Sequence, residues 1–136
     1  MATSFSMKRR VQFAETDLAG VLHFANYYRM MEEVEHAFWR SQELSVITQD
    51  GARHISWPRV STRCEHFAPA RFEDELDLVL RVAEVGDKSV TYEVEFLLRG
   101  ERIALGRCSA VCCEVTSGGF EPVAIPTHLR KKLIAE

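Results

Sequence analysis

The chain has 136 residues, of which 46% are hydrophobic and 27% are charged. This balance is typical of a folded globular domain and excludes a disordered or fibrous chain. The formal net charge of −3 at pH 7 argues against sequence-independent binding to nucleic acid, so local basic residues would have to hold any anionic ligand. Neither a membrane-spanning apolar run nor the apolar core of a secretory signal is present. We therefore expect one cytoplasmic domain over residues 1–136, with reduced cysteines and no membrane partner.

The first third of the chain predicts a strand, a loop and a long helix. Apolar residues alternate over 5–13 and predict a half-buried strand that Arg9 interrupts. The loop that follows contains Gly20, which permits unusual backbone angles. From about Phe24 to Glu43, apolar residues recur every three or four positions and predict an amphipathic helix. We expect Asn26 or a residue just before it to cap this helix.

Four further strands are predicted after the helix, over 57–67, 76–82, 90–98 and 102–115. One face of the last strand carries only small residues, which are Ala104, Gly106, Cys108, Ala110 and Cys112. A face of this kind usually packs against something bulky, and the long helix is the obvious partner. Residues 117–119 predict a turn, and a short basic helix or tail begins at about Pro126.

This order of elements predicts an α+β fold in which a curved five-stranded antiparallel sheet wraps around one long central helix. The short turns between the later strands favour antiparallel pairing. One helix cannot cover both faces of such a sheet, so the outer face or an edge remains for a second copy. We therefore expect an oligomer.

The stretch before the helix places a carboxylate, Asp17, beside the predicted helix N-terminus. The unpaired N–H groups of a helix N-terminus can polarise a carbonyl or hold an oxyanion. A carboxylate nearby can attack that carbonyl or take a proton from water. A lone aspartate in a loop more often stabilises a turn, so the residue types alone do not decide between the two roles.

The same stretch resembles the 4-hydroxybenzoyl-CoA thioesterase family of hotdog-fold proteins. Its signature is similar to Phe13-Ala-Glu-Thr-Asp17-Leu-Ala-Gly20-Val-Leu-His-Phe24-Ala-Asn26-Tyr27. Two later stretches, Phe67-Ala-Pro-Ala-Arg-Phe-Glu-Asp-Glu-Leu76 and Asp87-Lys88-Ser89, also resemble family patterns. The resemblance runs from about Met7 to Val115.

The resemblance implies that the protein hydrolyses an acyl-CoA to a free acid and CoA, without a metal or another cofactor. Asp17 would act as nucleophile or general base, the Phe24 N–H would polarise the thioester carbonyl, and Gly20 would shape the loop between them. Further expected substrate-binding positions are Thr16, His23, Asn26, Tyr27, Lys88 and Ser89. The sites would lie between subunits of a homodimer or homotetramer, so Lys88 and Ser89 would serve a neighbouring copy.

Two positions depart from the related bacterial acyl-CoA thioesterases, many of which have Tyr and His where this chain has Phe13 and Phe24. An aromatic-lined pocket favours an aryl or medium-length acyl group. Glu32, early in the helix, is the alternative catalytic carboxylate, because another hotdog subgroup uses a helix glutamate.

The five histidines show no metal-ligand spacing, and Cys112 and Cys113 point to opposite faces of a strand. The alternative functions are a non-catalytic module that binds acyl-CoA or acyl carrier protein, and a dehydratase. The Thr16-Asp17 loop argues against the dehydratase.

Overall fold

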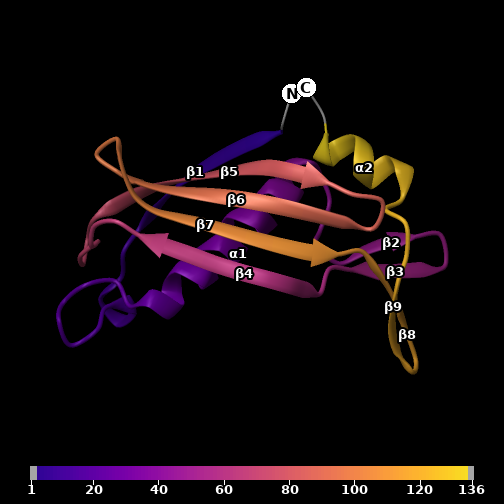
Figure 1. Cartoon of the computed structure of the whole chain (residues 1–136), viewed down its shortest axis with the longest axis horizontal. Helices are drawn as coiled ribbons and strands as arrows, with labels where there is room; N and C mark the ends of the chain where they lie inside the picture. Colours follow the sequence, from indigo (N-terminus) through magenta and orange to yellow (C-terminus); the bar gives the residue numbers. More distant parts are fainter. Residues whose placement is uncertain (1–2, 135–136) are drawn as a thin grey trace.

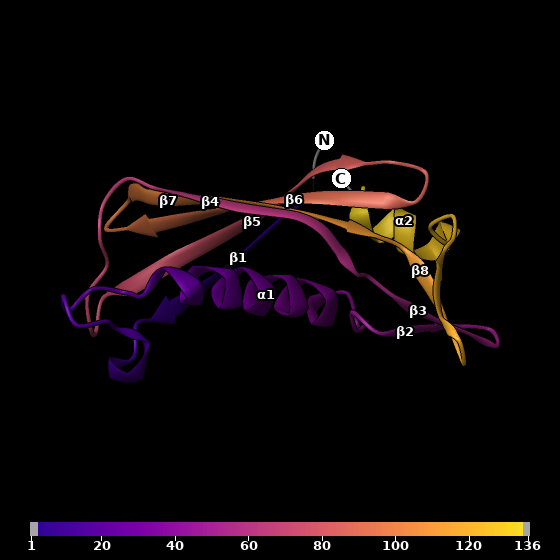
Figure 2. The same ribbon diagram turned by 60° about the horizontal axis from the view of Figure 1, so that its bottom comes forward.

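The computed structural model describes residues 3–134, so the first and last two residues of the expected 1–136 domain lie outside it. Five antiparallel strands form the main sheet in the order β1-β5-β6-β7-β4. These strands are β1 (Ser4–Arg10), β4 (Arg59–His66), β5 (Glu75–Val85), β6 (Ser89–Leu98) and β7 (Glu101–Val111). The long helix α1 (Phe24–Ser41) lies along one face of the sheet (Figure 1, Figure 2). The antiparallel sheet with a long helix on it is therefore confirmed.

The core fills the space between α1 and the main sheet. Fully buried side chains of α1, such as Met30, Val34 and Phe38, meet fully buried leucines of β5. The small-residue face of β7 lies against the helix as predicted, because a Cβ atom added at Gly106 would come within 2.4 Å of the Met31 sulfur. The face of the main sheet that points away from α1 carries charged side chains, with ion pairs such as Glu93–Arg107 at 2.7 Å.

The expectation of a single sheet is incomplete, whereas the short basic helix expected from about Pro126 is present. A second antiparallel sheet, in the order β2-β3-β8-β9, lies beyond the C-terminal end of α1 (Figure 1). Its strands are β2 (Thr48–Asp50), β3 (Arg53–Ser56), β8 (Cys113–Thr116) and β9 (Gly119–Pro122). A short second helix, α2 (Thr127–Leu133), follows. Strands of three or four residues are too short to show a periodic pattern, so the sequence gives no sign of β2 and β3.

The limits of the predicted strands differ from the observed limits, and two of these differences have a clear local cause. The strand expected over 102–115 is divided at Cys112, where the backbone amide donates to the Lys88 carbonyl at 2.6 Å and the chain leaves the main sheet. The first strand ends at Arg10, and Phe13 belongs to a short 3-10 helix, η1 (Phe13–Glu15). Phe13 is 75% exposed there rather than half-buried in a strand. Its exposed ring forms part of the apolar surface beside the Asp17 loop.

No helix within residues 3–134 is long and apolar enough to cross a lipid bilayer.

Candidate active site

The loop between η1 and α1 holds Asp17 in a tight reversal of the chain. The Asp17 amide donates to the Val21 carbonyl at 2.9 Å, and the Gly20 amide donates to the Asp17 carbonyl at 2.9 Å. Gly20 has φ of +79°, a left-handed conformation that favours glycine, so its predicted role in shaping the loop has a physical basis. Thr16 closes the base of the reversal through a bridge to Leu22, and its hydroxyl donates to the Phe13 carbonyl at 2.7 Å.

The two oxygens of the Asp17 carboxylate have different surroundings. Oδ1 accepts hydrogen bonds from the amides of Ala19 at 2.9 Å and Val21 at 3.4 Å. Among the described residues, none donates to Oδ2, and the side chain is partly exposed. Asp17 therefore stabilises its own turn and still presents one carboxylate oxygen to a ligand.

The N-terminus of α1, which follows the loop, has a backbone amide that is free to donate a hydrogen bond. His23 caps α1, because its Nδ1 accepts from the Ala25 amide at 3.1 Å. The expected cap was Asn26 or a residue just before it, and the cap observed is His23, three positions before Asn26. The Phe24 amide, at the first helical position, has no acceptor within residues 3–134. It is an unpaired donor of the kind that can hold a carbonyl oxygen.

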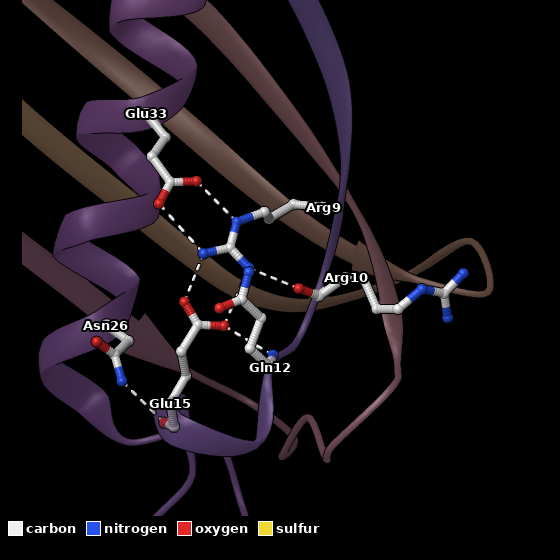
Figure 3. A network of polar contacts seen from close by, with 6 residues as sticks. All are labelled: Arg9, Arg10, Gln12, Glu15, Asn26 and Glu33. Carbon is white, nitrogen blue, oxygen red and sulfur yellow. Dashed lines mark hydrogen bonds and ion pairs between the residues drawn. The ribbon is translucent and has the colours of Figure 1, made fainter.

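Asn26 and Glu15 attach the loop to the helix. The Asn26 side-chain amide donates to the Glu15 carbonyl at 2.8 Å (Figure 3). The His23 backbone amide donates to the same carbonyl at 2.9 Å. Asn26 was predicted as a substrate contact, but its side-chain N–H stabilises the fold of the loop.

Arg9 of β1 joins this loop to the body of the protein. Its guanidinium forms an ion pair with the Glu15 carboxylate and donates through Nε to Glu33 of α1 at 2.7 Å (Figure 3). Burial alone would raise the pKa of Glu15, but hydrogen bonds from Arg9 and the Gln12 amide outweigh it, so this pKa lies below its usual value. Hydrogen bonds to the carboxylates of Glu15 and Glu33 in turn raise the pKa of Arg9. The network fixes β1, η1 and α1 relative to one another.

This network is not predicted from the sequence, in which Arg9 is only an interruption of an alternating strand pattern. The available signal was its position, because Arg9 lies on the same strand face as Phe5 and Met7 and therefore points inward. An inward charge needs a partner of opposite sign. Two carboxylates, Glu15 and Glu33, supply it.

Exposed aromatic and aliphatic side chains surround the loop. Phe13, Leu18, Phe24 and Phe72 are each at least 50% exposed. The rings of Phe13 and Phe72 meet edge to face at 5.6 Å, and those of His23 and Phe24 stack at 4.7 Å. Apolar surface of this kind next to a carboxylate is typical of a site for a partly hydrophobic ligand.

Three of the expected binding residues lie away from Asp17. Tyr27 is 3% exposed and packs between His66 and Phe96, where burial raises its pKa to about 12, so it is part of the core. Lys88 and Ser89 lie at the turn between β5 and β6, at the opposite end of the main sheet from the Asp17 loop (Figure 1). The ten residues of β6 separate the two ends by ~30 Å. Within one subunit, Lys88 and Ser89 do not reach Asp17.

The cysteine thiols are poorly suited to nucleophilic catalysis. All four cysteines are free, and burial raises the pKa of Cys64 and of Cys112 to about 11. A thiol with so high a pKa carries very little thiolate at neutral pH.

An antiparallel sheet laid on one long helix is the architecture of the hotdog-fold proteins. The chain belongs to the thioesterase-like superfamily, which matches it over residues 11–133.

Named relatives and solved structures resemble the chain over nearly its full length. The 1,4-dihydroxy-2-naphthoyl-CoA hydrolase of Synechocystis is 26% identical, over 90% of this chain and 91% of the relative. The acyl-CoA thioester hydrolase YbgC of Escherichia coli O6:H1 is 25% identical, over 98% and 96%. The structure of a gentisyl-coenzyme A thioesterase superimposes with a TM-score of 0.79 at 27% identity, over 93% of this chain and 99% of that one.

Proposed function

We propose that this protein hydrolyses acyl-CoA thioesters to a free acid and CoA, with an aromatic or medium-length acyl group. One observation carries the proposal. The Asp17 carboxylate, which has one oxygen without a donor among the described residues, and the unpaired amide of Phe24 lie at the two ends of one short loop held by hydrogen bonds. The names of the relatives above, all of which act on CoA thioesters, support this activity.

The two groups have separate tasks in the reaction. The Phe24 N–H, at the positive end of the α1 dipole, donates to the thioester carbonyl oxygen and stabilises the charge that develops on it. Oδ2 of Asp17 then attacks the carbonyl carbon, or removes a proton from the water that does so. In the first route the C–S bond breaks, the CoA thiolate takes a proton from water, and water then hydrolyses the acyl–Asp17 anhydride to the free acid. In the second route the water oxygen joins the acyl carbon as the C–S bond breaks, and the proton held by Asp17 passes to the CoA sulfur. The bonds from Ala19 and Val21 hold Oδ1 in place, so the attacking oxygen is pre-oriented.

We further propose that the protein forms a homodimer or homotetramer, because an edge strand of the main sheet leaves backbone groups that a second copy can pair with. The sheet has two edge strands, β1 and β4, and six of the eight residues of β4 are exposed. His66 lies at the Asp17 end of β4, where it contacts Tyr27, and Arg59 lies at the end nearer Lys88. If two β4 strands pair antiparallel about a two-fold axis, the partner's β5–β6 turn comes to the same end as Asp17. Lys88 and Ser89 would then approach the CoA portion of a substrate bound to the neighbouring subunit.

A panel of aromatic and aliphatic acyl-CoAs, assayed for release of free thiol, tests the activity. We expect thiol release by the unaltered protein and a fall in kcat of at least about a thousandfold in Asp17→Asn, which keeps an acceptor oxygen for the loop. Glu32→Gln is the matched control, because Glu32 is an exposed carboxylate of α1 outside the loop. Activity that survives Asp17→Asn and is lost in Glu32→Gln would move the catalytic role to Glu32. Tight binding of acyl-CoA without any thiol release would instead indicate a non-catalytic binding module.

A further inference from the structure

His23 is fixed at the start of α1 by four contacts. Its backbone amide donates to the Glu15 carbonyl at 2.9 Å, and its carbonyl accepts from the Asn26 amide at 2.9 Å. Its imidazole Nδ1 accepts from the Ala25 amide at 3.1 Å. The ring also stacks on that of Phe24, with centroids 4.7 Å apart. The imidazole therefore takes the place that the side-chain oxygen of a Ser, Thr, Asp or Asn cap usually fills.

These contacts decide which amide in the first turn of α1 stays free. The amides of Ala25 and Asn26 both donate to His23, whereas the Phe24 amide has no acceptor in the described part of the chain. A carbonyl oxygen that approaches this end of the helix therefore meets one available donor, the Phe24 N–H. If the Ala25 amide lost its acceptor, a second donor would compete for that oxygen one residue further along the helix. The His23 side chain thus selects the donor.

An imidazole cap functions in one protonation state only. Nδ1 can accept from the Ala25 amide only while it carries no proton, so the capping form is the neutral ring with its hydrogen on Nε2. When the ring gains a second proton, Nδ1–H and the Ala25 N–H are two donors that face each other. The new positive charge also lies at the positive end of the α1 dipole. Protonation of His23 therefore removes the cap, which a hydroxyl or carboxamide oxygen would retain at every pH.

The surroundings of His23 offer an imidazolium little compensation. The titratable and charged groups on the segments packed around it are Glu15, Asp17, Arg29, His66 and Arg71. The Glu15 carboxylate is already paired with Arg9, and Oδ1 of Asp17 accepts from the amides of its own turn. Oδ2 of Asp17 is the one oxygen of these two carboxylates without a donor among the described residues. An imidazolium that paired with it would occupy the attacking oxygen.

We propose that His23 is a positioning residue for the thioester carbonyl and that only its neutral ring leaves the Phe24 amide as the sole donor. This inference rests on the proposed acyl-CoA hydrolase function and adds a proton-controlled cap to the same site. His23 acts through the amides of the first turn and needs no contact with the reacting atoms. Histidine side chains change protonation between about pH 5 and 8, so acidification in this range lowers kcat.

The test is the pH profile of kcat for whichever acyl-CoA of the panel is hydrolysed fastest. We expect kcat of the unaltered protein to fall at least about fivefold between about pH 8 and pH 5.5. His23→Asn keeps a cap acceptor that does not titrate, so its kcat at pH 8 should stay within about twofold and the acidic decline should shrink to what Asp17 alone causes.

Two further variants separate the cap from the ring and from histidine in general. His23→Ala has no acceptor for the Ala25 amide, so we expect kcat to fall about tenfold at pH 8 with KM nearly unchanged. His128→Asn is the matched control, because His128 is an exposed histidine of α2. Its profile should equal that of the unaltered protein.

The outcomes separate failure of this inference from failure of the hydrolase proposal. An acidic decline that is the same in His23→Asn, or full activity in His23→Ala, overturns the role of His23 and leaves the hydrolase intact. If no acyl-CoA is hydrolysed, the hydrolase proposal fails, and NMR of the histidine ring nitrogens and of Ala25 amide exchange then decides on the cap. A neutral ring with its hydrogen on Nε2, and Ala25 protection that is lost as the ring titrates, support it. A hydrogen on Nδ1, or protection that does not follow the ring, overturns it.

Discussion

Arg9 of β1 and Glu33 of α1 are joined by two hydrogen bonds, from Nε to Oε1 at 2.7 Å and from Nη2 to Oε2 at 3.2 Å. The same guanidinium also holds Glu15, whose backbone carbonyl fixes the start of α1 through His23 and Asn26. One strand residue therefore determines how the Asp17 loop sits against the helix.

Replacing Arg9 with Met keeps much of the side-chain length and removes all of its donors. We expect the free energy of unfolding to fall by about 1–2 kcal/mol, because Glu15 and Glu33 lose their shared cation. We also expect a lower kcat with little change in KM, since the loop that carries Asp17 loses its support. Thermal unfolding and steady-state kinetics measure the two effects. Arg10→Met is the matched control, because Arg10 is an exposed arginine next along the strand. Equal kinetic losses in both variants would contradict the role of Arg9.

The pH dependence of stability should show the same network. The pKa of Glu15 is lowered in the folded protein, so the stabilisation by its charged form is fully present above its usual value of 4.5 and is lost as the pH falls through the folded value. We expect Glu15→Gln to flatten the decline in melting temperature below about pH 4.5 relative to the unaltered chain. A parallel decline in both proteins would show that Glu15 contributes nothing to acid sensitivity.

The main-chain donor at Phe24 can be tested apart from its ring. Phe24→Pro removes the N–H, and proline is well tolerated at the first position of a helix. His23, which precedes it, already has the extended backbone that proline requires, with φ of −66° and ψ of 139°. Phe24→Ala keeps the N–H and removes the ring.

We expect kcat to fall about a hundredfold or more in Phe24→Pro and only mildly in Phe24→Ala. Circular dichroism of both variants checks that α1 is retained. Equal losses in the two variants would mean that the ring matters and the amide does not.

Gly106 provides a test of the packing between β7 and α1. A Cβ atom at this position would lie 2.4 Å from the Met31 sulfur and 2.8 Å from its methyl carbon. Because Met31 is flexible, Gly106→Ala should cost only about 1 kcal/mol, whereas Gly106→Val should cost about 3 kcal/mol. Chemical denaturation measures both values. The double variant with Met31→Ala should recover part of the loss, and no recovery would contradict direct contact as the cause.

Lys88→Ala tests the proposed contact across subunits. We expect KM for acyl-CoA to rise about three- to tenfold with kcat unchanged, because a phosphate contact is the same in the ground and transition states. Lys8→Ala is the control, since Lys8 is an exposed lysine on β1, at the opposite edge of the sheet from β4. A change in KM that does not weaken with added salt would argue against a phosphate contact.

The sequence could predict elements that repeat a local pattern many times. The eighteen residues of α1 carry the three-and-four spacing of a helix, and the strict alternation of β6 predicts a strand within one residue of its limits. The Asp17 loop is also local, because its bonds join residues within four positions of each other. Its resemblance to a known signature could therefore be recognised before the structure was known.

Contacts between distant residues were decided only by the tertiary structure. Arg9 and Glu33, and likewise Glu35 and Arg59, are 24 positions apart, and no periodic pattern relates them. Lys88 and Asp17 both fit the family signature, yet the length of β6 holds them at opposite ends of one subunit. By itself, the sequence determined the long helix and the longer strands, because hydrophobic periodicity acts within a segment. Which charges meet, and where a cavity remains, depends on how those segments pack, and only the folded chain fixes that.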